Sequence, residues 1–145
     1  MENTQEINRG RHVLFSLHAH LVFVTKYRRS VFDAEHIDFL AKCFAEVCRK
    51  ADAELIEFNG EDDHVHLLIS YDPKTSISAL TNSLKGVSSR LLAKEFGRLH
   101  KWFYKGVLWS PSYFVVSCGG APLEIIEKYI QNQESSDPRL KARAW

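Results

Sequence analysis

Apolar residues repeat along this chain with two alternating periods, and the order of those periods limits the fold more than any other feature. Segments rich in β-branched residues, or alternating between apolar and polar residues, predict strands over 20–25, 54–59, 64–71 and 107–118, the last of them interrupted at Ser110 and Pro111. Apolar residues at helical spacing predict helices over 33–51, 76–100 and 122–134, with Asp33 as a cap. This order predicts an α+β fold: a ferredoxin-like split β-α-β arrangement with an antiparallel sheet, followed by a C-terminal helix that carries Tyr129.

The 145 residues fit one domain, 1–145, in which 1–16 and 135–145 are expected to be peripheral tails. Three cysteines without the spacing of a disulfide framework favour a reducing compartment. The first residues carry acidic side chains where a signal peptide would carry basic ones, and no apolar run is long enough to cross a membrane. We therefore expect a cytoplasmic protein with no membrane partner.

Charge is unevenly distributed along a chain whose net charge is only +1. Residues 33–63 hold ten acidic side chains against three basic ones, whereas residues 76–110 hold six basic side chains against one acidic one. A second basic cluster is 26–29 (KYRR). Clustered basic residues are what phosphate binding requires, although a solvated helix face has the same composition.

Two histidine pairs have the spacing of a half-built metal site. In a strand, residues two apart share a face, so His64 and His66 project together while the apolar residues between them point the other way. Paired imidazoles on a rigid strand suit a metal ion, although surface histidines give the same pattern. His18 and His20 have the same spacing but no flanking acid such as Asp63, and spacing alone does not choose between the pairs.

Tyr129 and Gln133 lie four residues apart in the last predicted helix, so their side chains stand one above the other. If that helix covers the histidine face, Gln133 could offer an oxygen to a metal while Tyr129 points at a bound phosphate. An amphipathic helix with a half-buried tyrosine and a solvated glutamine explains the same spacing.

Five segments, in this order, carry a family resemblance. They are 20–29 (HLVFVTKYRR), 63–68 (DHVHLL), 84–86 (LKG), 108–114 (LWSPSYF) and 128–133 (KYIQNQ). Together they resemble the insertion-sequence transposases with a single catalytic tyrosine and a His-hydrophobic-His (HUH) motif, a group that includes TnpA-like and REP-associated tyrosine transposases. The resemblance spans residues 17–133 and aligns His64 and His66, rather than His18, with the family's metal ligands.

The resemblance implies a mechanism. Mg²⁺ or Mn²⁺ would be held by His64, His66 and Gln133, and Tyr129 would attack the scissile phosphate to give a 5′-phosphotyrosine and a free 3′-hydroxyl. Asp63 is a candidate for the base that activates the tyrosine. No nucleotide cofactor is expected, because the bond energy is kept in the covalent link and the chain has no phosphate-binding loop motif.

The resemblance also implies single-stranded DNA hairpins at element ends as the substrate, in a bacterial or archaeal cell. The candidate backbone contacts are Lys26, Arg28, Arg29, Lys85 and Arg90, and the candidate stacking residues are Tyr27, Trp102, Phe103 and Tyr104. The family acts as a homodimer in which the tyrosine helix can serve the partner's metal site. Gly119 and Gly120, just before that helix, are a candidate hinge.

Three other functions fit parts of the sequence. An RNA-binding module can share the split β-α-β topology, but the aromatic strand motif that it needs is missing. A phosphoesterase with three alternating histidines would need a histidine where Leu68 stands. A domesticated relative that nicks repeat-element DNA would carry the same residues as a transposase.

Overall fold

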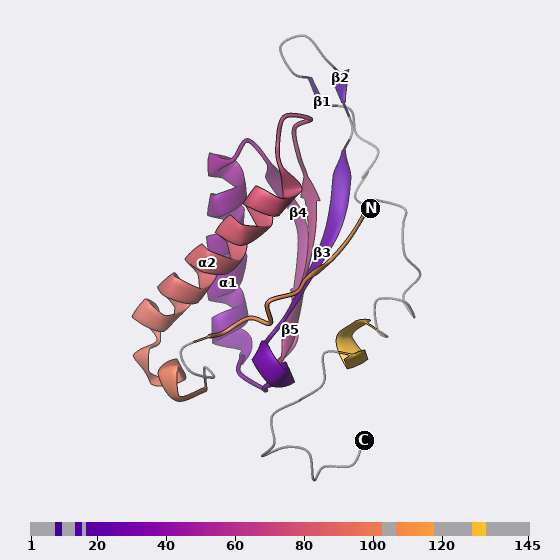
Figure 1. Ribbon diagram of the computed structural model, residues 1–145. Helices are drawn as coiled ribbons and strands as arrows, with labels where there is room; N and C mark the ends of the chain where they lie inside the picture. The colour runs from indigo at the N-terminus through magenta and orange to yellow at the C-terminus, as the bar shows by residue number, and fades with distance from the viewer. Residues whose placement is uncertain (1–7, 10–13, 16, 103–106, 118–128, 133–145) are drawn as a thin grey trace.

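A four-stranded antiparallel sheet organises the computed structural model, which describes residues 8–9, 14–15, 17–102, 107–117 and 129–132. Its strands are β3 (His18–Val24), β4 (Glu54–Gly60), β5 (His64–Ser70) and β6 (Phe114–Ser117), in the order β4-β5-β3-β6. The helices α1 (Ala34–Lys50) and α2 (Ile77–Glu95) both cover one face of it (Figure 1). This topology confirms the predicted α+β class and the ferredoxin-like split arrangement.

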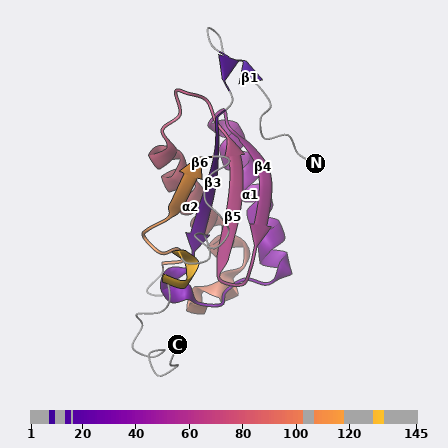
Figure 2. The same ribbon diagram turned by 90° about the vertical axis from the view of Figure 1, so that its right-hand side faces the viewer.

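The other face of the sheet carries much less of the described chain. A single helical turn, residues 129–132, lies on that side, near β3 and β6 (Figure 2). Two short strands, β1 (Asn8–Arg9) and β2 (Leu14–Phe15), pair with each other in a separate two-stranded sheet. None of the helices in the described part of the chain has the length and apolar character needed to span a membrane.

Helix α1 begins where its predicted cap lies. The Asp33 side chain accepts a hydrogen bond from the backbone N–H of His36 at 3.1 Å, and the His36 ring accepts one from the backbone N–H of Asp33. This reciprocal pairing satisfies N–H groups that have no partner within the helix. One turn further on, Ile37 packs against Gly60 at the end of β4, where an added Cβ atom would collide with it. The close approach fixes the β4–β5 hairpin against α1.

Two predicted elements are shorter than expected. Helix α2 ends at Glu95, and a 3₁₀ segment, Gly97–Trp102, continues to the end of the range that was predicted as helix. Of the interrupted strand predicted over 107–118, β6 forms Phe114–Ser117, and before the interruption Trp109 makes an antiparallel bridge to Thr25. The ladder is interrupted between these two parts, because Pro111 has no N–H and the Lys85 ammonium takes up the carbonyl oxygens of residues 110–112. Of the last predicted helix, only 129–132 falls within the described residues.

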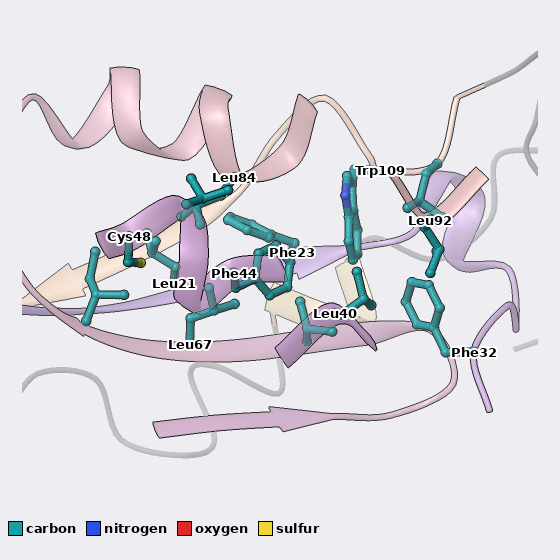
Figure 3. Close-up of a cluster of buried hydrophobic side chains, with 14 of the residues drawn as sticks. Leu21, Phe23, Phe32, Leu40, Phe44, Cys48, Leu67, Leu84, Leu92 and Trp109 are labelled. Atoms are coloured by element: carbon teal, nitrogen blue, oxygen red, sulfur yellow. The ribbon is translucent and has the colours of Figure 1, made fainter. Parts of the chain in front are cut away.

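The core lies between the sheet and the two helices (Figure 3). Phe44 of α1 is its centre, with ring centroids 5.9 Å from Phe23 of β3, 5.6 Å from Phe58 of β4 and 6.5 Å from Trp109. The indole N–H of Trp109 donates to the Ser88 hydroxyl of α2 at 3.0 Å, so this buried polar group is satisfied. One aromatic cluster therefore joins both helices to the sheet.

Replacement of Phe44 by alanine should lower the free energy of unfolding by about 3–5 kcal/mol, because the cluster cannot close around the cavity that the ring leaves. Urea denaturation followed by circular dichroism measures the change. Val115 of β6 is 42% exposed and provides the control. Val115→Ala should change the unfolding free energy by less than about 0.5 kcal/mol. A loss below about 1 kcal/mol in Phe44→Ala would contradict the central place given to this ring.

Candidate active site

The histidine pair lies on the open face of the sheet. Val24 and Val22 of β3 are the register partners of His64 and His66 of β5, and register partners in an antiparallel pair point to the same side. The imidazole rings of the two histidines lie 5.0 Å apart at 73°. Val65, Leu67 and Ile69, the alternate residues of β5, are buried on the helix side. The alternation predicted for this strand is therefore confirmed.

A hollow of about 400 Å³ adjoins the two rings. Its lining residues are His20, Glu57, Asn59, Glu61, His64, His66, Leu67 and Leu68. The competing pair lies further along the sheet, since His20 is the register partner of Leu68 and His18 that of Ser70. Leu68 is 4% exposed and occupies the third position on the histidine face. The three-histidine phosphoesterase arrangement is thus missing here.

His66 is held in its neutral form. Burial, followed by the charges of His64 and His20, lowers the pKa of His66 to about 4. An imidazole must be unprotonated to bind a metal ion, so His66 is a competent ligand at neutral pH.

Asp63 fixes the orientation of the other ring. One carboxylate oxygen lies 2.7 Å from Nδ1 of His64, and the second accepts a hydrogen bond from Nε of Arg28 at 2.8 Å. Burial alone would raise the pKa of the Asp63 carboxyl, but the hydrogen bonds from His64 and Arg28 outweigh it and hold that pKa below its usual value. Since both oxygens are engaged and the lowered pKa makes the carboxylate a weak base, Asp63 is better suited to orient His64 than to take up the proton of the tyrosine.

These features fit a divalent metal ion. A carboxylate on Nδ1 leaves Nε2 of His64 as the ligating nitrogen, which is the usual arrangement around metal-bound histidine. Within residues 8–9, 14–15, 17–102, 107–117 and 129–132, no group of three His, Cys, Asp or Glu side chains gathers to hold a metal. A third protein ligand must therefore be another residue type or come from elsewhere. Gln133, the predicted third ligand, lies outside the described residues.

Tyr129 lies on the same face of the sheet but has other partners. Its ring packs on Phe114 of β6, with centroids 5.3 Å apart, and its hydroxyl lies 3.2 Å from that of Ser112. The next residue, Ile130, is 7% exposed and packs against Val22 and Val24. Burial raises the pKa of the Tyr129 phenol, and the Ser112 hydrogen bond offsets only part of that effect. The phenol is therefore protonated where it lies.

Strand β3 separates the tyrosine's support from the histidines. Phe114 and His66 are both register partners of Val22, so they stand two strand spacings apart, roughly 10 Å. Tyr129 therefore lies on the same face of the sheet as His64 and His66, but its ring and hydroxyl contact Phe114 and Ser112. Nothing in the sequence pattern singled out Ser112 or Phe114 as the partners of this tyrosine, because neither is close to it along the chain.

The predicted DNA contacts fall into different surroundings. The Lys85 ammonium, whose pKa is lowered by burial, donates to the carbonyl oxygens of Ser110, Pro111 and Ser112 at 2.7–3.3 Å. It is therefore occupied by protein groups. The Lys26 ammonium lies 5.4 Å from the centre of the Tyr27 ring, a cation–π contact.

The two remaining arginines differ from each other. Arg29 is half-buried, and its carbonyl oxygen accepts a hydrogen bond from the Thr25 hydroxyl, whereas Arg90 is exposed on α2, one of the helices that cover the opposite face of the sheet (Figure 1). Trp102 ends the 3₁₀ segment, but its side chain lies outside the described residues, as do Phe103, Tyr104, Gly119 and Gly120.

Comparison with known proteins places this geometry in a family. Residues 13–133 match the family model described as IS200-like transposase. The chain is 31% identical over 132 residues to the ISDra2 transposase TnpA of Deinococcus radiodurans, covering 91% of this chain and 94% of that one. It is 30% identical over 126 residues to the transposase of insertion sequence IS200 from Salmonella typhimurium, covering 87% and 82%.

Solved structures agree with the sequence matches. A crystal structure of a Deinococcus radiodurans protein described as a transposase superposes with a TM-score of 0.80 at 31% identity, covering 89% of this chain and 99% of that one. A REP-associated tyrosine transposase bound to a REP hairpin superposes with a TM-score of 0.52 at 13% identity, covering 85% and 67%, and shares the fold. The chain therefore belongs to the IS200-like transposase family and is a transposase, an enzyme that processes DNA.

Proposed function

We propose that this transposase cuts and rejoins single-stranded DNA through Tyr129, at a divalent metal site formed by His64, His66 and Gln133. The observation that carries the proposal is the pair of histidines beside a hollow, on the same face of the sheet as the tyrosine. His66 is neutral at neutral pH, and His64 is oriented by Asp63. Mg²⁺ or Mn²⁺ are the ions proposed, and a bound ion would polarise the scissile phosphate.

In the proposed reaction the Tyr129 hydroxyl gives up its proton as its oxygen attacks phosphorus, and a phosphotyrosine bond forms to the 5′ side of the cut. The bond from phosphorus to the 3′ oxygen breaks, and that oxygen leaves as a 3′-hydroxyl after taking up a proton. A 3′-hydroxyl from another DNA end later attacks the same phosphorus and releases the tyrosine. One phosphodiester replaces another, so no nucleotide cofactor is needed.

Hairpin-bearing single strands at the ends of the element are the proposed substrate. The REP-associated relative of the same fold was solved with a hairpin, which supports this substrate class. The sequence relatives at 31% and 30% identity are described as transposases of the insertion sequences ISDra2 and IS200, which favours mobile-element ends over the repeat sequences that a domesticated nickase would recognise.

We further propose that the enzyme acts as a homodimer in which Tyr129 serves the partner's histidine pair. Support comes from the position of Tyr129, whose hydroxyl is bonded to Ser112 and whose ring lies on Phe114, across β3 from the histidines of its own chain. Tyr129 must leave this support to reach any histidine pair, and the same movement can take it to the pair of the partner. Subunit mixing distinguishes this case from action within its own chain.

Tyr129→Phe should abolish the covalent protein–DNA adduct, because it removes only the attacking oxygen. The assay incubates the protein with labelled hairpin-bearing single-stranded DNA and Mn²⁺ and resolves adducts on a denaturing gel. We expect a loss of at least ~10³-fold, as for other enzymes that lose their nucleophile. Tyr113→Phe, a neighbouring half-buried tyrosine, should keep the adduct. Adduct formation by Tyr129→Phe would disprove the assignment of the nucleophile.

His64→Ala and His66→Ala should each abolish Mn²⁺ binding and DNA cleavage, because a single imidazole cannot hold the ion in the proposed geometry. Isothermal titration calorimetry with Mn²⁺ and the gel assay measure the two effects. A chelator should abolish cleavage by the wild-type protein, and added Mn²⁺ should restore it. His18→Asn, at the other end of the same face, is the control and should bind Mn²⁺ normally. The opposite result would assign the metal to the competing pair.

Mixing Tyr129→Phe subunits with His64→Ala subunits should restore cleavage if the tyrosine acts in the partner's site. Such a mixed dimer has one site with both an intact histidine pair and a tyrosine. The adduct should form only on the His64→Ala polypeptide, which a size tag identifies on the gel. If the mixture exchanges subunits and stays inactive, the tyrosine acts within its own chain.

A further inference from the structure

We propose that Arg28 is a positioning residue that acts through Asp63 to fix the His64 imidazole for the metal ion. The proposal rests on the metal site of the proposed function and adds a role that no contact with DNA would explain. It starts from the Asp63 carboxylate, which bridges Arg28 Nε at 2.8 Å and His64 Nδ1 at 2.7 Å with different oxygens.

The bridging groups are sheltered from solvent. The side chains of Asp63 and His64 are each 14% exposed, and that of Arg28 is 28% exposed. An ion pair that is this far from water is screened less than one on the surface, so it can hold a carboxylate in one orientation. The Nε–H group lies in the plane of the guanidinium, which gives the contact a direction that a lysine ammonium would lack.

The backbone around Arg28 is bent to make this contact. Tyr27 and Arg28 have φ angles of 59° and 54°, so the backbone of two consecutive non-glycine residues has left-handed φ values. Sterics disfavour that region for such residues, and it persists only where the surroundings determine it. The turn directly follows β3 and points Arg28 back toward the β4–β5 hairpin.

Hydrogen bonds tie the turn to that hairpin. The buried Thr25 donates from its backbone N–H to the carbonyl oxygen of Asp63 at 3.0 Å, and its hydroxyl donates to the carbonyl oxygen of Arg29 at 2.6 Å. The carbonyl oxygen of Asp62 accepts from the backbone N–H of Val31 at 2.8 Å. The segment before the metal-binding strand and the turn after β3 therefore form one rigid unit.

The chemical consequence concerns the ring of His64. A fixed carboxylate on Nδ1 keeps the proton on that nitrogen and leaves the lone pair on Nε2 for the metal. Arg28 contributes by preventing Asp63 from rotating away. Its effect should thus appear in the affinity for the ion, in the absence of DNA.

The test measures Mn²⁺ affinity of the full chain by isothermal titration calorimetry without DNA. Asp63→Ala should weaken binding by about 10–100-fold, the usual cost of losing such a partner, and Arg28→Met should weaken it several-fold. The double variant should bind no more weakly than Asp63→Ala, because Arg28 acts only through Asp63. Arg28→Lys, which keeps the charge and serves if Arg28→Met does not fold, should fall between wild type and Arg28→Met.

Arg49→Met is the matched control. Its guanidinium pairs with Glu46 at 2.6 Å and 3.0 Å on the exposed face of α1, so Mn²⁺ affinity should not change. Nitrogen-15 NMR of the metal-free protein adds a second readout. It should find the His64 proton on Nδ1 in the wild type and a mixture of tautomers in Asp63→Ala.

Two outcomes would overturn the positioning role alone. One is normal Mn²⁺ affinity in Arg28→Met together with weaker binding of single-stranded DNA, which would make Arg28 a phosphate contact. The other is an additive loss in the double variant. Failure of the wild-type protein to bind Mn²⁺ would instead overturn the proposed metal site, and the positioning role with it.

Discussion

The antiparallel register between β3 and β5 is the constraint on which the rest of the molecule depends. It buries Leu21, Phe23, Val65 and Leu67 against the helices, and the same alternation places His64 and His66 on the other face, where they line the hollow. A slip of one residue would exchange the two faces, exposing the apolar set and burying both imidazoles. The hydrophobic core therefore decides which face of the sheet carries the histidine pair, and the contact with Asp63 then orients the His64 ring.

The two halves of the proposed site are held by different kinds of contact. The histidines belong to a central strand with a partner on each side, whereas Tyr129 lies beside the edge strand β6, with its ring on Phe114 and its hydroxyl near Ser112. Central strands are the last parts of a fold to open, while peripheral contacts open at small cost in free energy. This division suits the proposed roles, in which the tyrosine would carry a covalently bound DNA strand while the metal site stays fixed.

Sequence periodicity predicted the features that depend on local chemistry. The Asp33 cap, the β4–β5 hairpin and the shared face of His64 and His66 follow from spacing alone, and all three are confirmed. The bridge from Arg28 to Asp63 joins residues 35 positions apart through a left-handed turn, and no period or motif encodes such a contact. Gln133 stays a prediction, because it lies outside the described residues.

Lys85 shows why a basic residue in the sequence need not contribute to a basic surface of the folded protein. In the pattern of charges it belongs to the cluster that suggested phosphate binding, but its ammonium holds three successive carbonyl oxygens that leave the sheet ladder around Pro111. The contact with the Ser110 carbonyl is partly buried, so this ammonium is held by protein groups instead of standing free on the surface. The residue at the end of this segment, Ser112, bonds the Tyr129 hydroxyl. Lys85 thereby reaches the proposed nucleophile through the backbone, and its charge serves the site by shaping it.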